Sequence, residues 1–371
     1  MIKSKTIMAG AIACLVFVLS PGSGRCAEPG DSLSVAETLS SAEKGHWVGF
    51  PIAFYTPETG FGGGAAAGYI FPRRGDRHPS SSMGIGFYTE KKQTIIALAP
   101  ELYLEGGFHG LLEAGYQKFP DSYWGIGPDS GDDDEEKYTL EGIQTRLIVE
   151  FEVYRGLRIG GQFRYIRGVM LETEEGGALE NGTIPGSTSG TNAGIGILAT
   201  YDSRDNRFSS ERGWYLLLSH TTYGRIALSD YSYSSIVFDA RKFFPVFGSH
   251  VFATRLYSKS AMGTVPFQEM PDLGGPSDMR GYQAGRYRDK YAAYAQAEYR
   301  FPLVWVTSLA VFGSVGNVSR SPEYYSFDGL KYTGGGGIRF RLNKERFALR
   351  LDYAVTGEGG SNFYFSANEA F

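Results

Sequence analysis

The chain has 371 residues, a net charge of −4 and an aromatic content of 15%. This mild charge gives no electrostatic reason to expect nucleic-acid binding. The two cysteines, Cys14 and Cys26, lie close to the amino terminus, which excludes a disulfide scaffold and a thiolate zinc centre. The 51 glycines are roughly double the usual share of about 7%. An outer-membrane barrel and a secreted β-protein both remain compatible with this composition.

The first residues have the order of a secretory signal peptide. A short basic start precedes an apolar run over residues 9–20, which is too short to span a bilayer as a helix, and small residues follow it. We therefore expect residues 1–27 to be a signal peptide, cleaved after Ala27 or after Gly24. Residues 28–47 are expected to form a short periplasmic segment.

Beyond the signal peptide, apolar and polar side chains alternate in segments of about ten residues. One face of each segment is apolar and the other carries full charges, as where Arg350 and Asp352 oppose Leu349 and Leu351. A charged face fits a polar or salt-bridged barrel lumen, and not the dry interior of a soluble sandwich. The bilayer also requires that no strand edge stay open. We predict an all-β fold over residues 48–371, a transmembrane antiparallel β-barrel of about sixteen strands.

The connections between these strands alternate in length. Short connections are expected at 105–107, 154–156, 302–304 and 343–345, and long polar ones at 120–137, 171–190, 261–289 and 318–330. Barrels of this kind have short periplasmic turns and long external loops. We therefore expect both termini in the periplasm of a bacterium with an outer membrane.

Several patterns have both a functional and a plainer interpretation. The acidic run 129–136 lacks the spacing of a calcium loop, so a solvated external loop is favoured. Luminal arginines either select anions in a pore or pair with carboxylates, and pairing is favoured. The glycines at 60–68 fit strand bending better than phosphate binding. No nucleophile elbow is present, so we expect no enzyme activity, no cofactor and no bound metal.

Four stretches carry a family resemblance. They are the turn 201–215 with Asp202, Arg204, Asp205 and Gly213, the loop 273–282 with Met279, Arg280, Gly281 and Tyr282, the strand 297–303, and the pair 335–340 and 349–353 followed by the final aromatic Phe371. Together they resemble the BamA/TamA-like outer-membrane barrel superfamily, also called the bacterial surface antigen family. The resemblance covers residues 201–371. The chain resembles a stand-alone member without the periplasmic POTRA domains.

The resemblance implies that the long loop folds into the lumen and carries the Arg280 guanidinium with it. Relatives have an acidic partner on the following strand, where this chain has Ser314. Glu298 and Asp352 are the candidate partners here, and Arg300 and Arg339 are expected beside them. Phe371 matches the terminal aromatic signal of barrel-assembly clients. Glu369, two positions earlier, interrupts the apolar pattern of that last strand.

Two functions follow as expectations. In the first, the barrel inserts or translocates proteins or lipids through a lateral seam between its first strand, near residues 52–55, and its last, over 362–371. In the second, it is a passive channel or structural barrel without assembly activity. The expected partners are outer-membrane lipid and lipopolysaccharide, with a separate periplasmic protein or an unfolded outer-membrane client in the first case.

Overall fold

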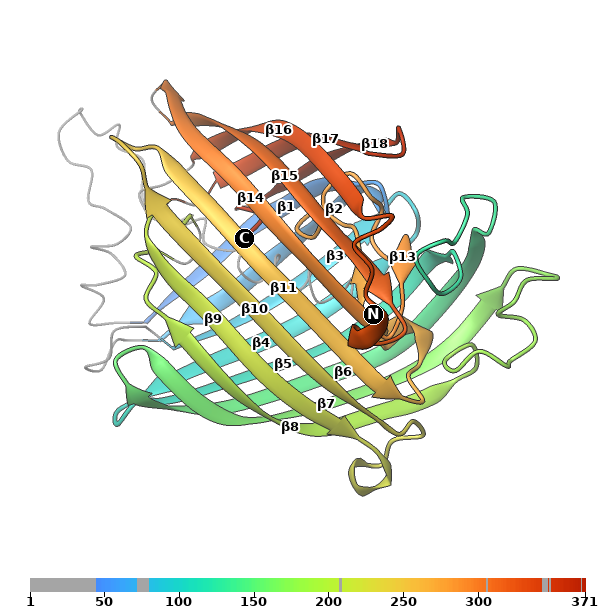
Figure 1. Cartoon of the computed structure of the whole chain (residues 1–371). Helices are drawn as coiled ribbons and strands as arrows, with labels where there is room; N and C mark the ends of the chain where they lie inside the picture. The colour runs from blue at the N-terminus through green and yellow to red at the C-terminus, as the bar shows by residue number, and fades with distance from the viewer. Residues whose placement is uncertain are drawn as a thin grey trace.

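The computed structural model describes residues 45–71, 80–206, 209–304, 306–341, 346, 348–367 and 369–371. The predicted signal peptide and the predicted turn 343–345 lie outside them. The described strands form one closed barrel of sixteen antiparallel strands, all tilted in the same sense (Figure 1). Each strand pairs with its neighbour in the chain, except that β11 pairs with β14 and β1 closes the barrel against β18. The predicted fold class is confirmed.

The wall strands are β1 His46–Thr56, β2 Gly60–Ile70, β3 Ser81–Thr89, β4 Thr94–Leu104, β5 Phe108–Tyr123, β6 Glu136–Tyr154, β7 Leu157–Thr173, β8 Gly190–Asp202, β9 Gly213–Tyr223, β10 Tyr233–Pro245, β11 Val251–Gly263, β14 Tyr291–Val304, β15 Thr307–Ser319, β16 Lys331–Arg341, β17 Ala348–Thr356 and β18 Ser361–Ala367. Two short strands and three single 3-10 turns lie between them: β12 Asp272–Leu273, β13 Tyr287–Arg288, η1 Arg225–Ala227, η2 Phe267–Glu269 and η3 Pro322–Tyr324.

The alternation of the sequence sets which face each side chain occupies. On β17, Arg350 and Asp352 are 2% and 0% exposed, whereas Tyr353 and Val355 are 54% and 45% exposed. The charged face therefore points into the lumen and the apolar face points outward, as a lipid-facing exterior requires.

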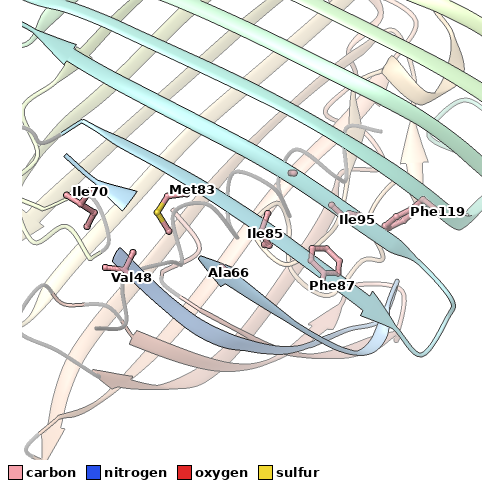
Figure 2. Packing of buried hydrophobic residues seen from close by; sticks show 9 residues of the cluster. Val48, Ala66, Ile70, Met83, Ile85, Phe87, Ile95 and Phe119 are labelled. Carbon is pink, nitrogen blue, oxygen red and sulfur yellow. The ribbon is translucent and has the colours of Figure 1, made fainter. Parts of the chain in front are cut away.

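The first strands depart from this polar-lumen pattern, because the described buried residues of β1 to β3 are mostly apolar and three residues of β4 and β5 join them. Outward residues such as Trp47 and Phe61 are 73% and 70% exposed. Figure 2 shows the opposite, buried face, which is formed by Val48, Ala66, Ile70, Met83, Ile85, Phe87, Ile95, Ala97 and Phe119. Gly62 leaves room for the ring of Phe54, since a Cβ there would lie 2.4 Å from a ring carbon. The luminal wall thus has an apolar sector and a charged sector.

Four strand boundaries differ from the sequence expectation. β1 begins at His46, ahead of the predicted barrel boundary at residue 48, and β5 and β6 extend into the expected loop 120–137. β14 continues through Pro302 to Val304, with a register shift between these two residues. A bulge accommodates a proline because the missing N–H then leaves no gap in the ladder.

The connection between β11 and β14 folds into the barrel and contains η2, β12 and β13. Its residues Leu273, Met279, Arg280 and Tyr282 are between 0% and 4% exposed. Among the described residues, no helix is both long and apolar enough to cross a membrane.

Candidate functional site

The inward loop between β11 and β14 is fixed at its tip by backbone hydrogen bonds to luminal side chains. Gly281 adopts a φ of 118°, a conformation that side-chain-bearing residues rarely adopt. Its N–H donates to the Tyr364 hydroxyl at 3.0 Å, and Asn362 donates to its carbonyl at 2.7 Å. The Met279 N–H donates to the Gln296 side chain at 2.9 Å. The tip is therefore held between β14 and β18.

This arrangement places the Arg280 guanidinium in the lumen beside β14, β15 and β17, where it is 1% exposed. Its Nη2 lies 2.6 Å from Glu298, and its Nη1 lies 2.5 Å from Asp352. The guanidinium also stacks on the Phe312 ring, 3.4 Å from its centroid. Arg280 thus contacts both candidate partners, while Ser314 instead contacts Thr333 at 2.6 Å.

Arg280 is one member of a buried charge network, which we call the luminal cluster. It consists of Arg280, Arg300, Arg339, Arg350, Glu298, Asp352 and Glu369. Arg339 bridges three carboxylates, and its nitrogens lie 2.5 Å from Asp352, 3.3 Å from Glu298 and 2.9 Å from Glu369. Each arginine of the cluster lies within 3.3 Å of at least one carboxylate, which offsets the cost of burying its charge.

Strand glycines make space for this network. A Cβ at Gly337 would lie 2.0 Å from an Asp352 carboxylate oxygen, and one at Gly335 would lie 2.7 Å from the Phe312 ring. The glycine run of β16 therefore provides the volume that the ion pairs and the Arg280–Phe312 stack occupy.

The last residues, 369–371, turn into the lumen and do not continue the wall; we call them the tail. The predicted last strand, over residues 362–371, is too long, because β18 ends at Ala367 and Phe371, which is 6% exposed, packs against Phe243 and Ala253. Its carbonyl accepts a hydrogen bond from Arg300 at 3.0 Å. In Figure 1, the letter C, which marks this end of the chain, lies over β11. The physical reason is Glu369, whose carboxylate pairs with Arg339 and lies 3.5 Å from Arg300.

The family turn between β8 and β9 has a well-defined geometry. Arg204 pairs with Asp202 at 2.7 Å and lies over the Tyr215 ring. Gly213 has a φ of 109°, and a Cβ there would lie 2.3 Å from the Ser203 carbonyl oxygen. This turn therefore requires glycine at position 213.

Asp205 holds the same turn closed and ties it to the connection between β16 and β17. Its carboxylate accepts hydrogen bonds from the backbone of Glu211 and Arg212 and from Arg346, the last at 2.7 Å. Burial acts to raise the pKa of the Asp205 carboxyl, but these donors outweigh burial and hold that pKa below its usual value. The carboxylate is therefore the stable form in this turn.

The turn between β8 and β9 contacts both the tail and Arg300 of β14. The Ser209 hydroxyl donates to Glu369 at 3.3 Å, and Arg300 donates to the Ser210 carbonyl at 3.3 Å. Sequence reasoning grouped Arg280, Glu298 and Asp352 but did not place Glu369 or these serines with them. The one signal for Glu369 was its charge at a position where the alternation calls for an apolar residue.

Comparison with known proteins defines the family. Residues 114–371 match the Omp85 superfamily domain. The chain belongs to the Omp85 superfamily. The barrel is similar to BamA from Haemophilus ducreyi lacking POTRA domains 1–3, with a TM-score of 0.64 and 13% identity over 88% of this chain and 70% of that one. It is also similar to CdiB from Acinetobacter baumannii, with a TM-score of 0.57 and 12% identity over 88% of this chain and 60% of that one. No curated protein matches by sequence.

In this Omp85 barrel, the closing seam is weakly paired. β1 pairs with β2 in continuous register from His46↔Ile70 to Thr56↔Gly60. Toward β18, the described residues give one registered pair, Tyr55↔Phe365. A contact between the outward rings of Tyr55 and Phe363 supports this pair. Most of the free edge of β1 therefore lacks a strand partner within the described part of the chain.

Other arginines of this Omp85 barrel also take part in ion pairs. Arg158 lies 3.8 Å from Glu152, and Arg164 lies 3.2 Å from Glu269 on the inward loop. In the acidic run 129–136, Asp132 pairs with Arg286 of the same loop at 2.7 Å. Across the described residues, no three His, Cys, Asp or Glu side chains are grouped to hold a metal ion. These contacts support the pairing interpretation of the luminal arginines over an anion-selective pore.

Proposed function

We propose that this Omp85 barrel inserts or translocates proteins or lipids at an outer membrane by opening laterally between β1 and β18. The observation that carries the proposal is the contrast between the two edges of β1. One edge is paired along its whole length with β2, and the other has the single registered pair Tyr55↔Phe365. Backbone groups without partners are costly in the bilayer, so this edge is ready to receive another strand.

The filled lumen supports the same route. The inward loop is attached to opposite parts of the wall through Arg164–Glu269, Arg255–Asp278 and Arg280–Asp352. Because the loop is bound to several sides of the wall, it obstructs the route along the lumen. A lateral opening is then the simplest path for a large substrate. The loop also braces the wall while the seam between β1 and β18 opens.

The short turns at one end of the barrel and the long loops at the other suggest how it is oriented in the membrane. We propose that the end with the turns 105–107 and 155–156 faces the periplasm, together with the tail, and that the long loops face the lipopolysaccharide layer. Outer-membrane lipid would surround the apolar exterior. The clients would be unfolded outer-membrane proteins, delivered from the periplasm by a separate protein, and no catalytic step is required.

The decisive experiment is client insertion by the purified full chain in liposomes. One variant locks the seam with a disulfide between Tyr55→Cys and Phe365→Cys, in a background where Cys14 and Cys26 are serine. A matched control places a disulfide between Ala53→Cys and Gly63→Cys, which are already paired on β1 and β2. The readout is the rate at which an unfolded outer-membrane barrel protein folds into the vesicles.

The native chain and the β1–β2 control should accelerate folding of the client, and the locked seam should abolish the acceleration until the disulfide is reduced. Equal acceleration by the locked form would exclude the lateral route. No acceleration by any form would favour the second hypothesis, a passive channel or structural barrel. Ion conductance of the same vesicles would then distinguish a passive channel from a structural barrel.

A further inference from the structure

A cavity of about 350 Å³ lies at the end of the barrel that carries the long loops. It is enclosed by the β5–β6 connection, the β15–β16 connection and the last residues of the inward loop before β14. Its floor consists of four residues that are between 1% and 7% exposed: Asp289, Asn317, Val318 and Ser319. The volume falls within the range of about 300–1,000 Å³ that small-molecule sites occupy.

The walls of this cavity are held in place by hydrogen bonds. On the side of the β5–β6 connection, the Gly127 N–H donates to the Arg288 carbonyl of the inward loop at 2.8 Å. On the opposite side, the Tyr325 hydroxyl donates to the Ala293 carbonyl of β14 at 3.0 Å. Both long connections are therefore fixed to the barrel beside the cavity, and the cavity is largely formed before any ligand arrives.

The buried carboxylate in the floor lacks a cationic partner. One oxygen of Asp289 accepts a hydrogen bond from the Lys290 N–H at 2.7 Å. Across the described part of the chain, its other oxygen has no hydrogen-bond donor and the carboxylate has no ion pair. Burial raises the pKa of this carboxyl, and the nearby charges of Lys290 and Arg320 only partly oppose the rise. A buried anion in this state is costly until a cation or a donor reaches it.

The charges at the rim are unpaired as well. Asp129 and Asp328 line the cavity, and among the described residues neither has an ion-pair partner. Arg320 lies over the Tyr324 ring, 3.4 Å from its centroid, and not against a carboxylate. The lining thus has three carboxylates and one guanidinium. In the luminal cluster, by contrast, every arginine contacts a carboxylate. This local excess of negative charge favours a cationic ligand.

The placement of the three carboxylates indicates the shape of that cation. They come from three separate segments of the chain, and within the described residues no three acidic, histidine or cysteine side chains are grouped to hold a metal ion. A metal ion draws its oxygen ligands to within about 2.6 Å of one point. A molecule with two or more separated ammonium groups can instead reach different carboxylates at once, and each ammonium offers three N–H donors.

We propose that this cavity binds a small organic cation with two or more separated ammonium groups, of the linear polyamine class. Asp289 is the buried anchor, Asp129 and Asp328 receive further ammonium groups at the rim, and Arg320 opposes binding by its charge. A bound ligand would join the β5–β6 and β15–β16 connections through the end of the inward loop. The inference goes beyond the proposed function, because no residue of the cavity belongs to β1 or β18.

The test is isothermal titration calorimetry of the purified full chain in a non-ionic detergent, with spermidine as the probe. Propylamine, which has a single ammonium group, and magnesium chloride alone are titrated in parallel. Asp289→Asn removes the anchoring charge with little change of shape, and Arg320→Gln removes the opposing charge. Asp133→Asn is the matched control, because it removes the same charge from an exposed position of the same β5–β6 connection that does not line the cavity.

Spermidine should bind the native chain saturably at one site and more tightly than propylamine. Asp289→Asn should weaken this binding by about tenfold or more, as the loss of one partner of a buried charge pair does. Arg320→Gln should strengthen it by about two- to fivefold, the usual scale for an exposed charge. Asp133→Asn should leave it within about twofold. Retained gel mobility of the folded barrel would show that each variant is intact.

Three results would overturn the proposal. Equal weakening by Asp289→Asn and Asp133→Asn would mean that spermidine is attracted to the acidic connection as a whole. Magnesium binding that prevents spermidine from binding would assign the cavity to a metal ion. Absence of saturable spermidine binding to the native chain would leave the cavity without a polyamine ligand. Because no client protein is present, failure of this site and failure of the insertion assay are distinguishable.

Discussion

Arg280 and Asp352 lie 2.5 Å apart inside the barrel, although 72 positions separate them in the chain. The same guanidinium stacks on Phe312 and pairs with Glu298, so it joins the inward loop to strands β14, β15 and β17. Removing it would leave two buried carboxylates with fewer cations, and the cost of that loss can be measured.

Arg280→Met should lower the free energy of unfolding by about 3 kcal/mol or more, because breaking a buried ion pair leaves uncompensated charge. Urea unfolding in detergent, followed by tryptophan fluorescence, measures this change. Arg225→Met on the exposed η1 turn is the control and should alter stability little. Similar losses in the two variants would show that the luminal ion pairs contribute no more than a surface charge.

Gly337→Ala should destabilise the barrel much more than Gly334→Ala on the same strand. The new Cβ at position 337 would lie 2.0 Å from Asp352 and must displace it from Arg339, whereas the nearest atom to a Cβ at 334 is 3.8 Å away. We expect a difference of about 2 kcal/mol, as overpacking of a filled interior produces. Parallel urea titrations of the two variants provide the comparison, and equal midpoints would contradict it.

Gly281→Ala tests the backbone geometry of the loop tip. A φ of 118° is strained for alanine, and a Cβ there would lie 3.2 Å from Thr356. The expected loss is roughly 1–3 kcal/mol, with greater protease sensitivity of the loop. Gly329→Ala, whose added Cβ meets no atom within 4 Å, should leave loop proteolysis unchanged. A protease-resistant Gly281→Ala loop would argue against this role.

Acid should weaken the turn between β8 and β9 through Asp205. Its pKa is lower in the folded protein than in the unfolded chain, where about 3.9 is usual. The carboxylate therefore stabilises the fold fully at neutral pH, and this stabilisation disappears as the pH falls through the lowered folded-state pKa.

The check is the difference in thermal midpoint between the native chain and Asp205→Asn. This difference should be largest near pH 7 and shrink as the pH falls below about 4, because both proteins then have an uncharged group at this position. A difference that stays constant down to pH 3 would mean that the Arg346 ion pair contributes nothing to stability.

The alternation of single strands was readable from the sequence because it is a local property. On β17, the order of Leu349, Arg350, Leu351 and Asp352 was enough to predict one lipid-facing and one luminal face. The candidate partners of Arg280 could also be predicted from the sequence, since few carboxylates lie at inward positions on the strands that follow the loop. That Arg280 binds both of them required the structure.

The tail shows where this local reasoning ends. Alternation alone continued the last strand to Phe371, whereas in the structure β18 ends at Ala367 and Phe371 packs against Phe243 on the luminal side. The decision comes from Glu369, because the arginines that receive it belong to β14 and β16 and become neighbours only when the barrel closes.

The sequence by itself thus determined the barrel class, the direction of most strand faces and the family motifs, since each depends on residues close together in the chain. The tertiary structure decided the membership of the luminal cluster, the inward tail and the weakly paired seam, in which Tyr55↔Phe365 is the one registered pair among the described residues. Those features are set by barrel closure, which brings distant charges into one confined lumen where each must find a partner.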